Sequence, residues 1–332
     1  MMLTIGQDNI SLPIEIDTHD EIQTLTFATN GGYLVSGGDK VRVWQVGDRK
    51  QMASMEAWRV RCLAVSKNGR WISAATYGGN VLVWDAETYE KVFKDWDGRR
   101  IVIAVDFSPD STRLITSRAN TIIVWNLALR SQEQILSHEF SAVQAAKYSP
   151  QGHRIATATR ESVRVWNSND GDLLVHIPVT VTPDYNNGLL WFNDHIFVLS
   201  DRAIKEFDSS TGSLVSEWAV HPSGRFSCIA LPQHGEFIAY SEKGTVTFWD
   251  TVTHTQLGLI QHSRDVLSIA ISPDDQFIAI GGPDGKIIIK KLADVLLLYR
   301  STARIAYSIL ESFFLASDLV SHGHLHRLLR YH

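Results

Sequence analysis

Short apolar runs with alternating polar positions recur along the whole chain at a nearly constant spacing. In the run 81–85, for example, three aliphatic residues are followed by Trp84 and an aspartate. Similar runs end 40 to 42 residues apart, and a fixed period of this size indicates an array of structural repeats. The residues that mark the ends of these runs are Trp44, Trp84, Trp125, Trp166, Phe207, Trp249 and Lys290.

Each repeat divides into short strands separated by turn residues. In the first repeat, 22–27 and 33–36 alternate with a period of two and lead into the run 41–44. Gly, Asn and Asp occupy the reversals between them, as short antiparallel strands require. The second, third, fourth, sixth and seventh repeats follow the same pattern.

The repeat resembles that of the WD-repeat β-propeller family, in which a tryptophan closes the third strand of each four-stranded blade. The resemblance implies an all-β fold, and the seven marks imply a seven-bladed β-propeller. The fifth repeat is degraded, because 189–192 turns almost directly into 196–199 and Phe207 replaces the tryptophan. Its spacing still predicts a blade. The irregular stretch 180–188 before it is expected to form a loop.

An alternating segment at 11–18 precedes the first repeat and has no blade of its own. In the family, such a strand becomes the outer strand of the last blade, which closes the ring and removes an open sheet edge. We therefore expect three parts in the chain: a tail at 1–10, the propeller at 11–292 and a helical tail at 293–332.

The pattern after Leu292 changes to a period near 3.5, which predicts an amphipathic C-terminal helix over 293–320. Its polar interruptions make it a poor membrane span. The family has no obligatory helix here. We expect the helix to dock on the propeller, and the alternative is a helix that binds a partner or a membrane surface.

Composition narrows the function further. A length of 332 residues alone would suggest two domains, but a repeat array of this kind forms one. The net charge of −5 argues against binding nucleic acid by bulk electrostatics. Cys62 and Cys228 both fall in expected inner-strand runs, which favours buried thiols over a disulfide. The first residues have no signal-peptide pattern, so we expect an intracellular protein, cytoplasmic or nuclear.

Histidines at one repeat position are the first candidates for chemistry. In the family, a blade is often braced by hydrogen bonds among a His, a Ser or Thr, a turn Asp and the Trp indole. Here the turn Asp survives only as Asp284, and no repeat has the full set. Because no nucleophile converges on these histidines, we expect structural roles for them. They stand 28 residues before the mark, at His138, His221 and His262.

A second histidine group lies near the C-terminus. Alternating imidazoles could share one face of an extended segment, but no Cys or acidic residue joins them, and a structural zinc site requires four fixed ligands. We therefore expect adventitious metal binding at most, and neither a cofactor nor a metal site. The group is His322, His324, His326 and His332.

The family geometry also places one set of loops on a common rim, and on three consecutive blades these loops are rich in arginine and aromatic residues. These types dominate binding hot spots, and clustered Arg suits carboxylate or phosphate groups. Asp20, Glu21 and Asp265 on neighbouring blades would make the rim polarised. The alternative is that these are ordinary polar loops whose aromatics cover the blades beneath. The candidate partner-binding residues are Trp58, Arg59, Tyr77, Arg99, Arg100, Arg118, Phe140 and Arg160.

We therefore expect a non-catalytic scaffold, a monomeric propeller that works within a complex. It would bind a protein or peptide partner, acidic or phosphorylated, on its rim or top face. Two alternatives remain open: a propeller hydrolase or lyase with a site at the channel mouth, and a sensor or targeting module of a larger assembly. Fold alone does not choose among them.

Overall fold

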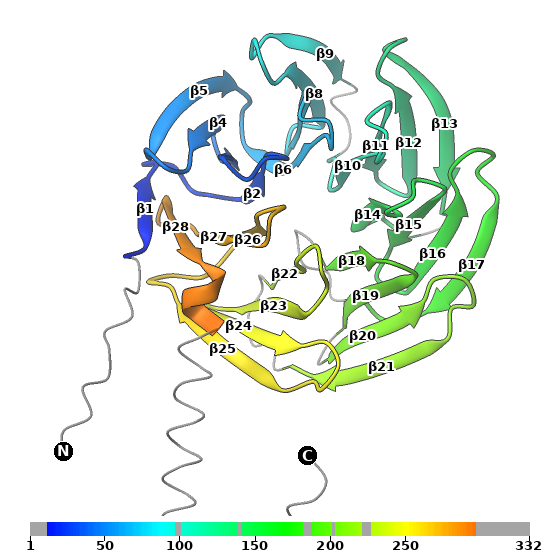
Figure 1. Ribbon diagram of the computed structural model, residues 1–332. Helices are drawn as coiled ribbons and strands as arrows, with labels where there is room; N and C mark the ends of the chain where they lie inside the picture. The colour runs from blue at the N-terminus through cyan, green and yellow to red at the C-terminus, as the bar shows by residue number, and fades with distance from the viewer. Residues whose placement is uncertain are drawn as a thin grey trace, which may run out of the picture.

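The fold is a ring of seven antiparallel sheets around a central axis (Figure 1). The computed structural model describes residues 12–96, 101–138, 141–181, 188–200, 203–220 and 227–296. Each sheet in this part of the chain has four strands, and in six of the sheets the strands follow one another outward from the centre. The predicted all-β, seven-bladed β-propeller is confirmed.

We call the strands of a blade a to d from the centre outward. Blade 1 contains β2 (Thr24–Phe27), β3 (Tyr33–Gly37), β4 (Lys40–Gln45) and β5 (Lys50–Glu56); blade 2 contains β6 (Val60–Val65), β7 (Trp71–Thr76), β8 (Asn80–Asp85) and β9 (Lys91–Trp96); blade 3 contains β10 (Val105–Phe107), β11 (Arg113–Arg118), β12 (Thr121–Asn126) and β13 (Ser131–Ser137). Blade 4 contains β14 (Ala145–Tyr148), β15 (Arg154–Ala158), β16 (Ser162–Asn167) and β17 (Leu173–Pro178); blade 5 contains β18 (Leu189–Phe192), β19 (His195–Ser200), β20 (Ala203–Asp208) and β21 (Leu214–Ala219). Blade 6 contains β22 (Ile229–Ala230), β23 (Phe237–Glu242), β24 (Thr245–Asp250) and β25 (Gln256–Gln261).

Blade 7 is built from both ends of the array. Its inner strands are β26 (Ser268–Ile271), β27 (Phe277–Gly281) and β28 (Lys286–Lys291), and its outer strand is β1 (Ile14–Asp17). Ile14 lies opposite Ile289 and Asp17 lies opposite Lys286 in an antiparallel register. The N-terminal strand therefore closes the ring as predicted, and β28 is not left as an open edge.

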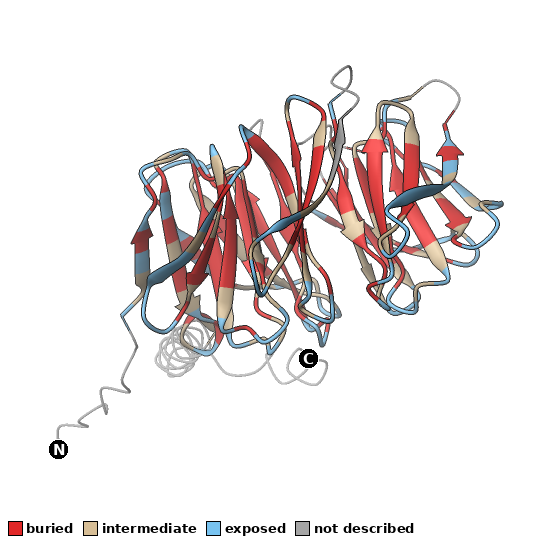
Figure 2. Ribbon diagram, turned by 90° about the horizontal axis from the view of Figure 1, so that it is seen from above, coloured by how far each residue is buried: buried red, intermediate tan, exposed pale blue. Residues whose placement is uncertain are grey.

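The core lies between the blades. The buried hydrophobic residues of the described chain form seven clusters, and each cluster joins two neighbouring blades, including blades 7 and 1. Figure 2 shows the buried positions running through the middle of the blades, with exposed turns at both ends of the strands. The repeating tryptophan packs against the preceding blade: Trp84 belongs to the cluster of blades 1 and 2, and Trp125 to that of blades 2 and 3. This position therefore holds adjacent blades together.

Blade 7 is the exception, because Lys290 replaces the aromatic residue. Here the start of the C-terminal helix contributes instead: residues 292–296 are helical, and Leu292 and Val295 are buried in the cluster of blades 6 and 7. Residues 297–320 of the predicted helix lie outside the described residues.

Because consecutive strands of each blade run in opposite directions, the disc has two distinct faces. The loops between d and a and between b and c lie on one face, which we call the upper face, and the a–b and c–d turns lie on the lower face. Each c–d turn of blades 1 to 6 contains one residue with positive φ, five positions after the mark. These residues are Arg49, Tyr89, Arg130, Gly171, Gly212 and His254.

Two details of the irregular segments differ from the regular pattern. Strand β22 has only two residues, so Cys228 lies just before it and not within a strand. Of the predicted loop 180–188, residues 182–187 lie outside the described part of the chain.

Candidate functional site

A single loop brings an exposed tryptophan to the upper face of blade 2. This d–a loop is anchored at both ends, because Ala57 and Val60 are buried and the Val60 N–H donates to the Gly38 carbonyl at 2.7 Å. Between them, Arg59 has φ of 53°, which reverses the chain. Trp58 is left 73% exposed, so most of its indole faces solvent.

The Arg59 guanidinium lies against two aromatic rings. Its Cζ is 5.8 Å from the Trp58 ring centroid and 5.0 Å from that of Tyr77. The Tyr77 N–H donates to the Arg59 carbonyl at 3.0 Å, which holds the b–c loop against the d–a loop. Arg59 therefore contacts both Trp58 and Tyr77, and we call these three residues the upper-face cluster.

A second arginine supports this cluster and was not among the sequence candidates. Arg61, only 2% exposed, places its Cζ 5.0 Å from the Tyr77 ring centroid. Two guanidinium groups therefore flank one tyrosine and raise the positive potential beneath the cluster. Arg61 could have been found from the sequence as a charged residue within a run of strand residues that are otherwise expected to be buried.

The other candidates are placed unevenly. Arg118 is the last residue of strand β11 and Arg160 lies on the b–c loop of blade 4, both at the upper face. The Thr121 hydroxyl donates to the Arg118 carbonyl at 2.9 Å, and the Val181 N–H donates to the Arg160 carbonyl at 3.1 Å. Arg99, Arg100 and Phe140 lie outside the described residues.

The acidic side of the predicted rim is partly neutralised by ion pairs within the blades. Asp20 pairs with Arg42 of β4, and Glu56 pairs with Lys40 at 2.7 Å. Glu21 and Asp265 are exposed on the d–a loops of blades 1 and 7. The charge that reaches solvent is thus smaller than a count of acidic residues would indicate.

The predicted histidine network exists in reduced form in blade 4. The Thr157 hydroxyl lies 2.8 Å from His138 Nε2 and accepts a hydrogen bond from Trp166 Nε1 at 2.8 Å. Burial lowers the pKa of His138 to about 4, with smaller contributions from Arg164 and His176, so the ring is neutral near pH 7. Arg160 occupies the position of the missing turn Asp.

Other blades retain smaller parts of this network. Trp44 Nε1 donates to Ser36 at 2.8 Å and Trp125 Nε1 donates to Thr116 at 2.9 Å. In blade 7, Ser263 donates to Asp284 at 2.6 Å, and His262 Nε2 lies 3.9 Å from the same carboxylate. His221 lies outside the described residues. These hydrogen bonds join strands b and c in blades 1 and 3, and the d–a and b–c loops in blade 7.

Metal-ligand groups and the two cysteines were the remaining candidates for chemistry. They contain no group of three or more His, Cys, Asp or Glu side chains that could hold a metal ion, while the predicted His322, His324, His326 and His332 group lies outside them. Cys62 and Cys228 are buried free thiols, and burial raises the pKa of each to about 12, so neither is a thiolate nucleophile at neutral pH. No helix in the described ranges has the length and apolar character to cross a bilayer.

Comparison with known proteins agrees with this architecture. A family model described as "WD domain, G-beta repeat" matches residues 49–85, 89–126 and 253–289, and the first two of these segments end one residue after a mark. The chain belongs to the WD-repeat family. Proteins of this family generally mediate protein–protein interactions or act as scaffolds, and they are typically non-catalytic.

Several WD-repeat relatives are similar over most of this chain. Autophagy-related protein 16 of Arabidopsis thaliana is 26% identical over 282 residues, covering 81% of this chain and 47% of that protein. B-type cell cycle switch protein ccs52A of Medicago truncatula is 25% identical, covering 81% and 50%, and periodic tryptophan protein 2 of Arabidopsis thaliana is 23% identical, covering 76% and 29%. This WD-repeat chain therefore spans half or less of the length of these relatives.

Proposed function

We propose that this WD-repeat propeller is a non-catalytic interaction module that binds an acidic or phosphorylated peptide segment of a partner protein. The binding surface in this proposal is the upper-face cluster of Trp58, Arg59 and Tyr77. The observation that carries it is the exposed Trp58 indole beside an arginine already held by two rings.

The geometry suits such a ligand for two reasons. A guanidinium that rests on aromatic faces keeps its in-plane N–H donors available for bidentate hydrogen bonds to a carboxylate or phosphate. Its position is also restricted before binding, so less side-chain entropy is lost when the ligand arrives. Trp58 then offers a large apolar surface that a peptide could cover, and exposed tryptophans of this kind are common at interface hot spots.

The proposed surface continues around the rim. Arg118 and Arg160 would extend the positive surface over blades 3 and 4, and Arg99, Arg100 and Phe140 are further members of the proposal. An extended peptide could then place successive acidic groups on successive blades. The acidic residues of blades 1 and 7 would favour one orientation of the peptide over the other.

The test is a peptide-array screen with acidic and phosphorylated sequences, followed by titration of the best peptide. Trp58→Ala and Arg59→Glu should each weaken binding by about tenfold or more, the loss expected at a hot spot. Val252→Ala is the matched control, because Val252 is 85% exposed on a lower-face turn of blade 6. The proposal fails if the two cluster variants bind as tightly as Val252→Ala.

The rim extension is tested separately by replacing Arg99 and Arg100 with Glu. We expect weaker partner capture with unchanged thermal unfolding. Unchanged capture would remove these residues from the surface and leave the upper-face cluster as the binding site.

A further inference from the structure

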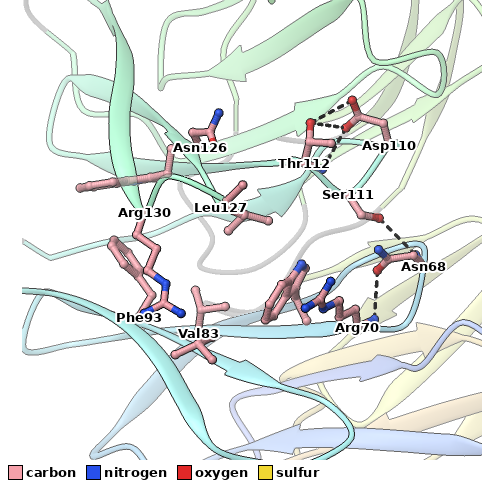
Figure 3. A pocket seen from close by; sticks show the side chains of 14 residues that line it. Asn68, Arg70, Val83, Phe93, Asp110, Ser111, Thr112, Asn126, Leu127 and Arg130 are labelled. Carbon is pink, nitrogen blue, oxygen red and sulfur yellow. Dashed lines mark hydrogen bonds between the residues drawn. The ribbon is translucent and has the colours of Figure 1, made fainter.

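A groove opens between blades 2 and 3 on the lower face, on the opposite side of the disc from the upper-face cluster. Its volume is about 400 Å³, within the range of small ligand sites. Figure 3 shows its two walls: Leu127 and Asn126 on one side, and Val83 and Phe93 on the other. At one end, the Asn68 N–H donates to Ser111 Oγ at 3.1 Å and joins the two blades.

The next two blade pairs have a polar bridge at the equivalent place. The first residue of strand b is an arginine in blades 3 and 4, and it reaches across to the following blade. Arg113 Nη1 donates to the Ser168 carbonyl at 3.5 Å. Arg154 Nη1 donates to the Ser209 carbonyl at 3.4 Å and to Ser210 Oγ at 3.0 Å.

In blade 2 the equivalent position is Trp71, and the residue equivalent to Ser168 and Ser209 is Leu127. Here an aromatic and an aliphatic side chain line the groove at the place where blades 3 to 5 have a polar bridge. Blade 1 also has an aromatic residue at this position, Tyr33, and a groove of about 410 Å³ lies between blades 1 and 2.

The floor of the groove is apolar. Phe93 and Trp125 meet edge to face, with ring centroids 5.3 Å apart and an interplanar angle of 61°. Val83 and Leu127 complete this surface, and the neighbouring turn residue Leu129 is 72% exposed. An aromatic side chain of a ligand would add to this ring pair in the offset geometry that aromatic groups prefer.

The rim carries two arginines, one from each blade. Arg70 stacks on Trp71 with its Cζ 4.6 Å from the ring centroid, and Arg130 lies beside Phe93 in Figure 3. Neither guanidinium is among the ion pairs within 4 Å that join described residues. Asp85 lies near Arg70, and backbone hydrogen bonds from Thr88 and Glu87, with a smaller contribution from the Arg70 charge, hold the pKa of its carboxyl below the usual value. The acidic residue of the groove, Asp110, already accepts hydrogen bonds from Ser108 Oγ, Thr112 N and Thr112 Oγ1, which hold the pKa of its carboxyl below the usual value.

We infer that this groove is a second docking site, which binds a short peptide with one aromatic anchor between acidic residues. The anchor occupies the apolar floor, and the carboxylates on either side bind Arg70 and Arg130. Charge complementarity selects this occupant, because the cations on the rim have open donors while the groove's own carboxylate is satisfied. The site is separate from the upper-face cluster and does not depend on it.

The test is fluorescence anisotropy of the full chain with a labelled nonapeptide that has a central Phe, two Asp on each side, and Gly and Ser at the ends. Two matched peptides carry Ala for Phe or Asn for every Asp. We expect each change to weaken binding by about tenfold or more. Equal binding of the three peptides, or no binding of the first, would overturn the inference.

Variants of the chain locate the site. Arg130→Glu, at an exposed side chain, should weaken binding of the Phe peptide by about tenfold. The double variant Trp71→Arg with Leu127→Ser introduces the bridge of blades 3 and 4 and should abolish binding, with circular dichroism to check folding. Trp58→Ala should leave binding unchanged.

Loss of binding in Trp58→Ala would assign the peptide to the upper-face cluster and overturn the inference. Retained binding in Arg130→Glu would overturn it too. The other possible occupant of the groove is a second copy of the chain, and sedimentation velocity tests for it. If the unliganded chain is a dimer and Arg130→Glu dissociates it, a second copy fills the groove and the inference of a peptide is overturned.

Discussion

Trp218 and His254 lie stacked on each other although they belong to different blades. Their ring centroids are 4.4 Å apart and their planes are 14° from parallel. Trp218 is on the outer strand of blade 5, and His254 is the positive-φ residue in the c–d turn of blade 6. The contact shows how each c–d turn packs on the outer strand of the preceding blade, and so holds the disc together at its outer edge.

Replacing His254 with Ala should destabilise the propeller by about 1 kcal/mol, because an aromatic pair contributes that much beyond its buried area. Urea denaturation followed by tryptophan fluorescence measures the change. Val252→Ala in the same turn is the control and should shift the stability by less than about 0.5 kcal/mol. Equal effects of the two variants would show that the stacking contributes nothing.

The equivalent position in blade 5 is Gly212, and it tolerates no side chain. Its φ is +74°, and an added Cβ would lie 2.8 Å from Val175 Cγ1 and 3.1 Å from Ile177 Cγ1 of blade 4. Gly212→Ala should therefore cost about 1 to 3 kcal/mol through strain and displacement of strand β17. Gly47→Ala, with no atom within 4 Å of the new Cβ, is the matched control for thermal unfolding. A melting temperature as high as that of Gly47→Ala would contradict this account of the turn.

Thr157→Val should destabilise the chain by about 1 to 3 kcal/mol, because His138 and Trp166 are both buried and would both lose their hydroxyl partner. Thr157→Ser keeps the hydroxyl and should retain most of the stability in the same denaturation assay. If Thr157→Val and Thr157→Ser had the same stability, the Thr157 hydroxyl would not contribute to the stability of blade 4.

Much of this fold follows from the sequence. The spacing of the marks predicts the number of blades, because at six of the seven marks an aromatic residue packs against the preceding blade. It predicts blade 5 as well, where Phe207 provides a similar buried volume. Closure by β1 follows from counting, since blade 7 has three strands of its own.

The sites are less predictable. The groove between blades 2 and 3 depends on Trp71 and Leu127, which lie 56 positions apart and each fit an ordinary strand or turn. Only the packing of the two blades shows that they line one groove. The positive φ of Tyr89 and His254, in contrast, belongs to a local turn, because each N–H donates to the carbonyl of the aspartate that follows the mark, Asp85 or Asp250.

His138 should make the stability sensitive to pH in the acidic range. Its pKa is about 4 in the folded chain and near 6.5 when unfolded, so between these values the unfolded state binds the extra proton. The free energy of unfolding should therefore fall as the pH drops from about 6.5 towards 4. His138→Gln should be less stable than wild type at pH 7.5, and this difference should shrink at pH 5.

Urea denaturation at several pH values makes the comparison. Gly47→Ala, which retains His138, should follow the pH profile of wild type. A stability difference between wild type and His138→Gln that stays constant from pH 7.5 to pH 5 would rule out this histidine as the source.

The central claim, that the upper-face cluster captures an acidic segment of a partner, is tested most directly by photo-crosslinking. Benzoylphenylalanine replaces Trp58 in one full chain and Val252 in another, and the adducts formed in cell extract are mapped by mass spectrometry. We predict adducts at position 58 that map to an acidic or phosphorylated segment, and that disappear when Arg59 is also changed to Glu. Adducts no more frequent at position 58 than at 252, or unaffected by the Arg59 change, would contradict the claim.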